Sequence, residues 1–155
     1  LALRHLPEGC IFNAVCETGK CLPDAIQILT LCSTGNEWMK VSDYGRFALS
    51  FYDKYTGEGV RVFLDSSKLG DYPELKNWFF RLVPKKEQNF QLLMKNIRDA
   101  HESILGAHRV TVPVKSGHKD GPKKILTCPE CGEAYPESDS DLCAACGGES
   151  YYSQE

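Results

Sequence analysis

The sequence has no apolar run close to the ~20 residues that a bilayer-spanning helix needs, so no membrane segment is expected. Its start shows no basic stretch followed by an apolar one, the pattern of a secretory signal, and we therefore expect a cytoplasmic protein. The P-loop, Gly-x-Gly-x-x-Gly and Gly-x-Ser-x-Gly motifs are absent. An excess of positive charge is absent too: the net charge is -3 and the isoelectric point about 5.8, which argues against nucleic acid as a partner.

The composition that remains is that of an ordinary globular protein. The chain has 155 residues, of which 42% are hydrophobic and 25% charged, enough for one medium domain with a small appendage. Because it begins with Leu1 rather than Met, inside a segment that resembles an amphipathic helix, we expect the natural protein to begin upstream.

Composition and charge divide the chain in two. Residues 115–124 hold two glycines, a proline and four lysines, which is typical of a linker. Residues 119–155 carry three basic and eight acidic side chains, a net charge of -5, whereas the residues before them carry +2. We therefore predict a main domain over 1–114, a linker over 115–124 and an acidic C-terminal module over 125–152.

The eight cysteines fall into two groups, and the C-terminal group carries a strong motif. It consists of two Cys-x-x-Cys pairs, each followed by glycine: Cys128, Cys131, Cys143 and Cys146. Each pair places two sulfurs on one tight turn, and two pairs form the tetrahedral cage of four sulfurs that zinc prefers. Since protein fills all four positions and leaves none for water, the motif predicts a structural zinc ribbon over 125–152.

Disulfides, free thiols and a rubredoxin-like iron site are the alternatives to zinc. A reducing cytosol argues against disulfides, but the spacing does not separate iron from zinc. A segment this short cannot bury enough apolar surface to fold alone, so metal binding would supply its folding free energy. Its acidic charge argues against contact with phosphate and favours a stabilising or protein-docking role.

The main domain alternates strand-like and helix-like segments, which predicts an α+β fold with helices on one face of a small, mainly antiparallel sheet. The expected strands are 10–16, 46–52, 59–64 and 109–114, with the middle two joined as a hairpin and the last an edge strand. The expected helices are 22–31, 71–81 and 85–106, the last with Gly106 as its stop.

Three motifs of the main domain occur in a specific combination. Cys21-Leu22-Pro23-Asp24-Ala25-Ile26-Gln27 precedes Cys32-Ser33-Thr34-Gly35-Asn36, and Gly59-Val60-Arg61-Val62 follows on a predicted strand. Together with the four-cysteine ribbon, they resemble the FmdE family, named after the E subunit of formylmethanofuran dehydrogenase, over roughly residues 10–64 and 127–147. The His-Gly-His-x-Cys-Pro-Gly element that usually opens this family is absent, and by the family's order it would precede Leu1.

This resemblance implies a two-layer sandwich, a homodimer and a metal site built partly from the absent element. It also implies a metal-binding accessory protein that works near a molybdenum- or tungsten-dependent formylmethanofuran dehydrogenase or a related redox system. The pterin metal and the formyl chemistry would belong to other subunits, so we expect no catalytic activity of the chain itself.

Cys21 is the candidate ligand for a second metal ion of unknown identity. It precedes the predicted helix 22–31, where the helix dipole favours the thiolate, and Asp24 lies one turn on as a second ligand or outer partner. The alternative is a small buried thiol beside an ordinary first-turn charge. Cys32 sits at the other end of that helix, roughly 15 Å away, and cannot share the metal.

Two other functions stay open. A metal at Cys21 with an open position would make the protein an enzyme that activates water or a thiol. A regulator would instead dock through its ribbon.

The remaining candidate site residues are predicted to have structural and not functional roles. Cys10 and Cys16 share one side of a predicted strand and are expected in the core. Arg46 and Arg61 are expected on a solvated strand face, with a meeting across the hairpin as the alternative. None of the four scattered histidines is assigned to a site. The aromatic residues Trp38, Trp78, Phe79 and Phe80 are expected in the core or at a dimer interface.

Overall fold

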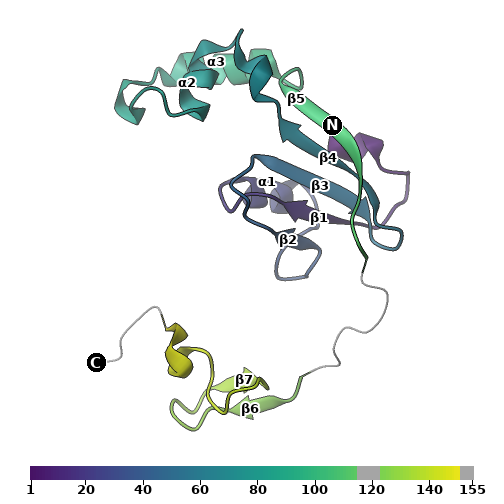
Figure 1. Ribbon diagram of the computed structural model, residues 1–155, viewed down its shortest axis with the longest axis vertical. Coiled ribbons are helices and arrows are strands. Elements are labelled where there is room, and N and C mark those ends of the chain that lie inside the picture. The colour runs from purple at the N-terminus through teal and green to yellow at the C-terminus, as the bar shows by residue number, and fades with distance from the viewer. Residues whose placement is uncertain (115–122, 151–155) are drawn as a thin grey trace. The chain divides into compact units, whose positions relative to one another are not determined.

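A computed structural model describes residues 1–114 and 123–150 of the chain. The chain divides into two compact units, Leu1–Val114 and Lys115–Glu155 (Figure 1). Of the predicted linker, residues 115–122 lie outside the described residues. No helix among the described residues is long and apolar enough to cross a membrane.

The first unit is built around a five-stranded sheet with the strand order β2-β1-β3-β4-β5. Only β1 and β2 are parallel, and the other neighbouring pairs are antiparallel. The predicted α+β fold with a mainly antiparallel sheet is thereby confirmed. The strands are β1 (Phe12–Cys16), β2 (Met39–Val41), β3 (Ala48–Asp53), β4 (Glu58–Leu64) and β5 (Leu105–Thr111).

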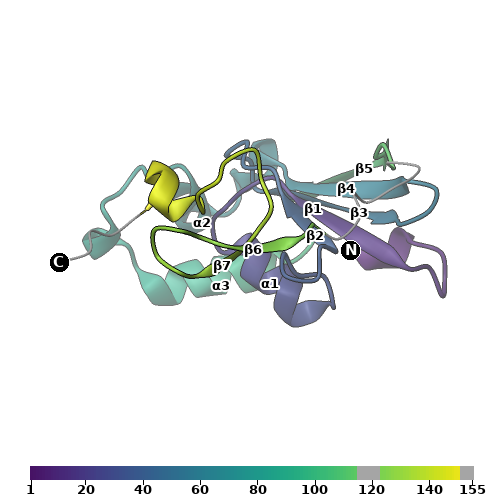
Figure 2. The same cartoon turned by 90° about the horizontal axis from the view of Figure 1, so that it is seen from below.

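One face of this sheet carries the main core. Ala14 on β1, Phe51 on β3 and Val60 on β4 form one row of paired residues across the sheet, and all three are buried. The short helices η1 (Ala2–His5) and α1 (Leu22–Leu29) cover this row through Ala2 and Ile26. Figure 2 shows α1 on one side of the sheet. The two-layer arrangement therefore comes from η1 and α1.

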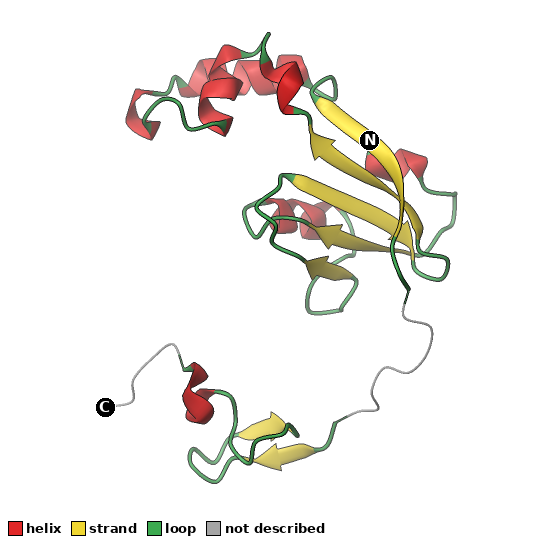
Figure 3. Cartoon of the chain, viewed as in Figure 1, coloured by secondary structure: helices red, strands yellow, loops and turns green. Residues whose placement is uncertain are grey.

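The other two α-helices build a separate arm. It consists of η2 (Ser66–Leu69), α2 (Pro73–Phe79), η3 (Lys85–Glu87) and α3 (Phe90–Ala100), between β4 and β5. The arm has its own core, whose buried members are Leu69, Leu75, Leu93, Ala100 and Ile104. Figure 3 shows these helices gathered at one end of the sheet.

The prediction of one helix over 85–106 was wrong. The Asn89 side chain accepts a hydrogen bond from the Leu92 N–H and caps α3 there, and the chain leaves the helix at His101 with a φ of +46°. Gly106 is not a helix stop: it lies in β5 opposite Phe63, where a Cβ would be 2.8 Å from a ring carbon. The last strand accordingly runs over 105–111 instead of 109–114.

The described part of the second unit, residues 123–150, is small and has little apolar core. Strands β6 (Ile125–Thr127) and β7 (Ala134–Pro136) form an antiparallel pair, and a helical turn, η4 (Ala145–Glu149), follows. Within residues 123–150 only Cys128 and Tyr135 are buried. Burial of apolar surface alone therefore cannot account for the fold of this unit.

Candidate metal centre

The four cysteines of the C-terminal unit converge on one point. The sulfurs of Cys128, Cys131, Cys143 and Cys146 all lie within 4.8 Å of one another. The Cys131 and Cys143 sulfurs, one from each pair, are 3.9 Å apart. These separations are longer than a disulfide bond, all four thiols are free, and four sulfurs around one centre are the donor set that zinc takes in structural sites.

Two similar turns bring the sulfurs together. After the first pair, the Gly132 N–H donates to the Cys128 carbonyl at 2.8 Å, and after the second, the Gly147 N–H donates to the Cys143 carbonyl at 2.9 Å. Gly132 has a φ of +76°, a region where a Cβ is disfavoured. The glycine that follows the first cysteine pair is therefore required by the turn itself.

The thiols of this quartet differ in acidity. Backbone N–H groups of Cys143 and Cys131 donate to the Cys128 sulfur and lower the pKa of that thiol to about 6. Hydrogen bonds among the crowded sulfurs raise the pKa of Cys146 to about 12. The pKa of Cys131 is also raised, by desolvation and by hydrogen bonds to neighbouring sulfurs, which outweigh a lowering by the backbone of Glu133. Without a cation the quartet thus holds few thiolates together, whereas a divalent metal would offset half the charge of four thiolates and bond to each of them.

Cys21 lies apart from this centre. It is exposed, it is the N-cap residue of α1 as the sequence predicts, and its φ is +44°. Among the described residues, no group of three metal donors includes Cys21 or Asp24. Cys32 is buried beyond the other end of α1, with its thiol near the Phe12 carbonyl.

The two remaining cysteines are not alike. Cys16 is fully buried on β1, which confirms the core prediction. The same prediction was wrong for Cys10, which is half-buried before β1 begins and whose thiol donates to an Asp53 carboxylate oxygen at 3.2 Å. Partial burial and that carboxylate raise the pKa of Cys10, so the thiol stays protonated at neutral pH.

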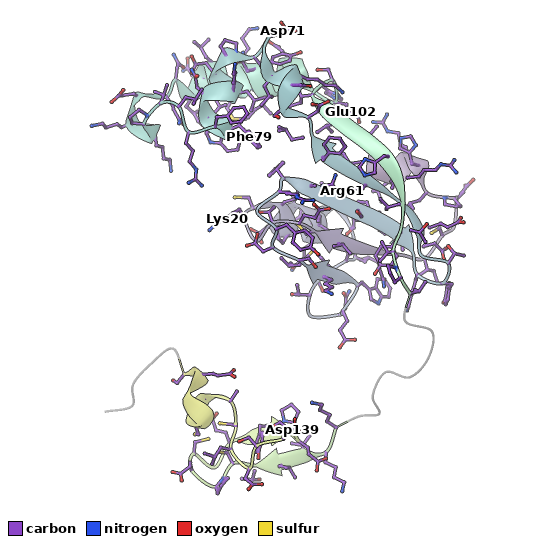
Figure 4. The ribbon with its side chains drawn as sticks, in the orientation of Figure 1. Lys20, Arg61, Asp71, Phe79, Glu102 and Asp139 are labelled. Atoms are coloured by element: carbon purple, nitrogen blue, oxygen red, sulfur yellow. The ribbon has the colours of Figure 1, made fainter. Side chains whose placement is uncertain are left out.

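The expectation that Arg61 lies on a solvated strand face was wrong. Its guanidinium donates two hydrogen bonds, of 2.5 and 2.7 Å, to the buried carboxylate of Glu17 just after β1. Arg46 approaches the same carboxylate at 3.8 Å. Hydrogen bonding from Arg61 holds the pKa of Glu17 below its usual value. Figure 4 labels Arg61 on the sheet.

Sequence reasoning missed this ion pair because its partners lie far apart in the chain. The only signal was the alternation in Gly59-Val60-Arg61-Val62, which places Arg61 on the face opposite the buried valines. Among the described histidines, His5 lines a cavity of about 460 Å³, whereas His108 lies opposite Arg61 on β5, packs on Phe63 and adds a small lowering of the pKa of Glu17.

Comparisons with known proteins agree with this geometry. Residues 1–112 match the family model "FmdE, Molybdenum formylmethanofuran dehydrogenase operon", and residues 119–153 match the "FmdE treble clef zinc finger". A crystal structure of a tungsten formylmethanofuran dehydrogenase FmdE-like protein from Syntrophus aciditrophicus is 48% identical, with a TM-score of 0.84 over 97% of this chain and 79% of that one. The zinc-finger match and the four-cysteine cluster together support a structural zinc.

A curated relative matches more weakly. It is a "Probable S-adenosyl-L-methionine-binding protein" from Archaeoglobus fulgidus, 29% identical over 76 residues, which are 48% of this chain. The chain spans only 21% of the length of that relative.

Proposed function

The chain belongs to the FmdE family, and from this premise we propose that it is a metal-binding accessory protein whose C-terminal unit is held by one structural zinc ion. Cys128, Cys131, Cys143 and Cys146 are its ligands in this proposal. The observation that carries it is the convergence of the four sulfurs within 4.8 Å of one another. Because four protein ligands leave no open position, this zinc would stabilise the unit and activate no water.

Element analysis of the purified full-length chain tests the zinc proposal. We expect about one zinc per chain, and a Cys143→Ala variant should lose it. Cys10→Ala is the matched control, since it removes a thiol outside the cluster and should retain the metal. Iron in place of zinc, or an unchanged zinc content in Cys143→Ala, would contradict the assignment.

The accessory role would place the protein in the cytoplasm, as a homodimer, beside a molybdenum- or tungsten-dependent formylmethanofuran dehydrogenase. Membership of the family and the likeness to the Syntrophus protein support this proposal. To test this role, the chain is mixed with a formylmethanofuran dehydrogenase from which the E subunit has been left out. We expect the two to co-elute as a stable complex, and separate elution would contradict the accessory role.

A second metal at Cys21 is supported by the exposure of that thiol at the start of α1. The same element analysis tests it: a second metal that disappears in Cys21→Ala but not in Cys10→Ala would assign the site. Water in its coordination sphere would favour the metal-dependent enzyme, and four protein ligands would favour a structural role. A content of one metal, unchanged in Cys21→Ala, would exclude the second site.

A further inference from the structure

A cavity of about 460 Å³ lies at the end of the sheet where β4 begins and β5 ends. Its walls come from three places: the residues at and just after the end of η1, the β3–β4 hairpin, and the end of β5. Figure 1 shows η1 next to β4. Cavities that bind small molecules usually hold about 300–1,000 Å³, so this one is large enough for a ligand.

This cavity is separate from the helical arm and from Cys21. Glu58 pairs with Thr111 beside the cavity, whereas Leu64 and Leu105, which flank the arm, pair at the other end of the same two strands. The part of β4 between Glu58 and Leu64 spans about 20 Å, at about 3.4 Å per residue. Strand β1 also begins near the β3–β4 turn and runs away from it toward Cys21. A ligand in the cavity would therefore touch neither the arm nor the candidate second metal site.

Two opposite charges line the cavity without pairing with each other. Glu58 of β4 is paired with Thr111 and Arg109 of β5 with Val60, so Glu58 and Arg109 are diagonal neighbours on one face of the sheet. Diagonal neighbours lie about 7–8 Å apart, within reach of long side chains. Yet neither side chain forms an ion pair or a hydrogen bond with any described residue. Both therefore remain available to a ligand in the cavity.

The second carboxylate of the lining, that of Asp53, is held by the protein itself. It accepts hydrogen bonds from the Thr56 and Tyr55 N–H groups, both at 2.8 Å, and from the Cys10 thiol at 3.2 Å. The two N–H groups, followed by the thiol, lower the pKa of Asp53, so it stays ionised and adds negative charge to the cavity wall. His5 is the remaining titratable residue of the lining, and its side chain forms no hydrogen bond with another described residue.

The charges of the wall select a ligand that carries both signs. Glu58 and Asp53 disfavour a simple anion, and Arg109 disfavours a simple cation. The lysine and arginines next to the lining in sequence are engaged elsewhere: Lys54 lies 5.6 Å from the centre of the Trp38 ring, Arg4 pairs with Glu102, and Arg61 pairs with Glu17. Glu8, which is exposed next to the lining, adds negative charge. A zwitterion satisfies both Glu58 and Arg109.

We propose that this cavity binds a free α-amino acid with an apolar side chain. Its ammonium group meets Glu58, and its carboxylate accepts two parallel hydrogen bonds from the Arg109 guanidinium. Its side chain lies against the apolar part of the wall, which includes Leu6, Pro7 and Val60. This binding depends neither on the zinc ion nor on the accessory role proposed above, and it gives the first unit a small-molecule ligand of its own.

Ligands that lack one of the two charges test the class of molecule. The isotope-labelled chain is titrated with L-leucine, with isocaproate, which lacks the ammonium group, and with isoamylamine, which lacks the carboxylate. We expect L-leucine to shift the amide resonances of Gly59, Val110 and Thr111 with a dissociation constant below about 1 mM, and each analogue to bind about 10-fold more weakly or worse. Isocaproate or isoamylamine that binds as tightly as L-leucine would show a site for one charge only and would overturn the inference.

Substitution of the two charged residues tests the site itself. Glu58→Gln and Arg109→Gln should each weaken L-leucine binding about 10-fold or more. Arg109→Gln should also bind isoamylamine as well as it binds L-leucine, because the variant no longer recognises the carboxylate. Arg98→Gln is the matched control, since Arg98 is an exposed arginine of α3 outside the cavity that forms no ion pair among the described residues. It should bind L-leucine like the wild type, and thermal melts should show that all three variants fold.

Three further results would overturn the inference. The first is the absence of any shift of the cavity resonances with L-leucine, L-valine and L-phenylalanine up to about 10 mM. The second is a set of shifts confined to residues outside the cavity. The third is an unchanged affinity for L-leucine in Glu58→Gln or Arg109→Gln. Zinc content is measured on the same samples and should equal that of the wild type, so failure of the ligand site leaves the zinc proposal standing.

Discussion

At the scale of single residues, the Glu17–Arg61 ion pair is the contact that most distinguishes the structure from the sequence expectation. The side chains of the two residues are only 9% and 17% exposed, so each ion has lost most of its hydration and depends on the other. The pair joins the end of β1 to β4, and its Glu17 lies four residues before Cys21. It therefore fixes the segment that leads into α1.

Replacing Glu17 should be strongly destabilising. We expect Glu17→Gln to lower the free energy of unfolding by about 3 kcal/mol at neutral pH, because Arg61 is left buried without its counter-ion. Asp99→Asn is the matched control: Asp99 pairs with Lys95, but both side chains are well exposed, so the loss should stay below about 0.5 kcal/mol. Equal losses in the two variants, measured by urea unfolding, would contradict the account.

The same pair should make stability depend on acid pH. Because Arg61 lowers the pKa of folded Glu17, the contribution of the pair is fully present above the pKa that Glu17 has in the unfolded chain. It is lost as the pH falls through the lower pKa of the folded state. The difference in unfolding free energy between wild type and Glu17→Gln should therefore shrink as the pH falls below the usual pKa of a glutamate. A difference that stays constant with pH would contradict this dependence.

At the scale of elements, local signals predicted the β3–β4 hairpin and the start of α1, while contacts between distant segments decided the rest. The Gly-containing turn between two β-branched and aromatic runs was sufficient for the hairpin, and Pro23 and Asp24 were sufficient for α1. In residues 90–104 the helical spacing of apolar residues does not stop at Ala100, where α3 ends. The reason is that Ile104 packs in the same arm core as α3 although Ile104 itself is not helical. Pairing of β5 with β4 overrides the helical pattern there.

Two glycines provide a test at this scale. On Gly59 of β4 a Cβ would lie 2.6 Å from the Tyr52 Cα of β3, so Gly59→Ala must push the two strands apart. We expect a loss of about 2 kcal/mol in unfolding free energy. Gly70→Ala is the control, because Gly70 has a φ of -57° and nothing within 4 Å of its Cβ position. It should be neutral or stabilise slightly, and a Gly59→Ala variant as stable as this control would contradict the packing.

At the scale of the whole molecule, each of the two units is stabilised by a different kind of interaction. The first has two apolar cores, whereas the described part of the second buries little besides Cys128 and Tyr135. The zinc cluster was predictable from spacing alone because its ligands are close in sequence. The exposure of Phe80 and Phe90 was not, since the exposure of an apolar residue depends on the packing of every element around it.

Metal removal should therefore unfold only one of the two units. With a strong chelator, we expect limited proteolysis to cleave within residues 123–150 while fragments covering 1–114 persist, and the thermal transition of the first unit should not shift. Readdition of zinc should restore the resistance of the second unit. Loss of both units together on chelation would contradict their separate stabilisation.

The most direct test of the central claim is an X-ray absorption spectrum at the zinc edge on the full-length protein. We predict a single zinc environment of four sulfur neighbours at about 2.3 Å, with no nitrogen or oxygen in the first coordination sphere. A zinc site with nitrogen or oxygen ligands, or a protein that holds no zinc and has these cysteines joined as disulfides, would contradict the account.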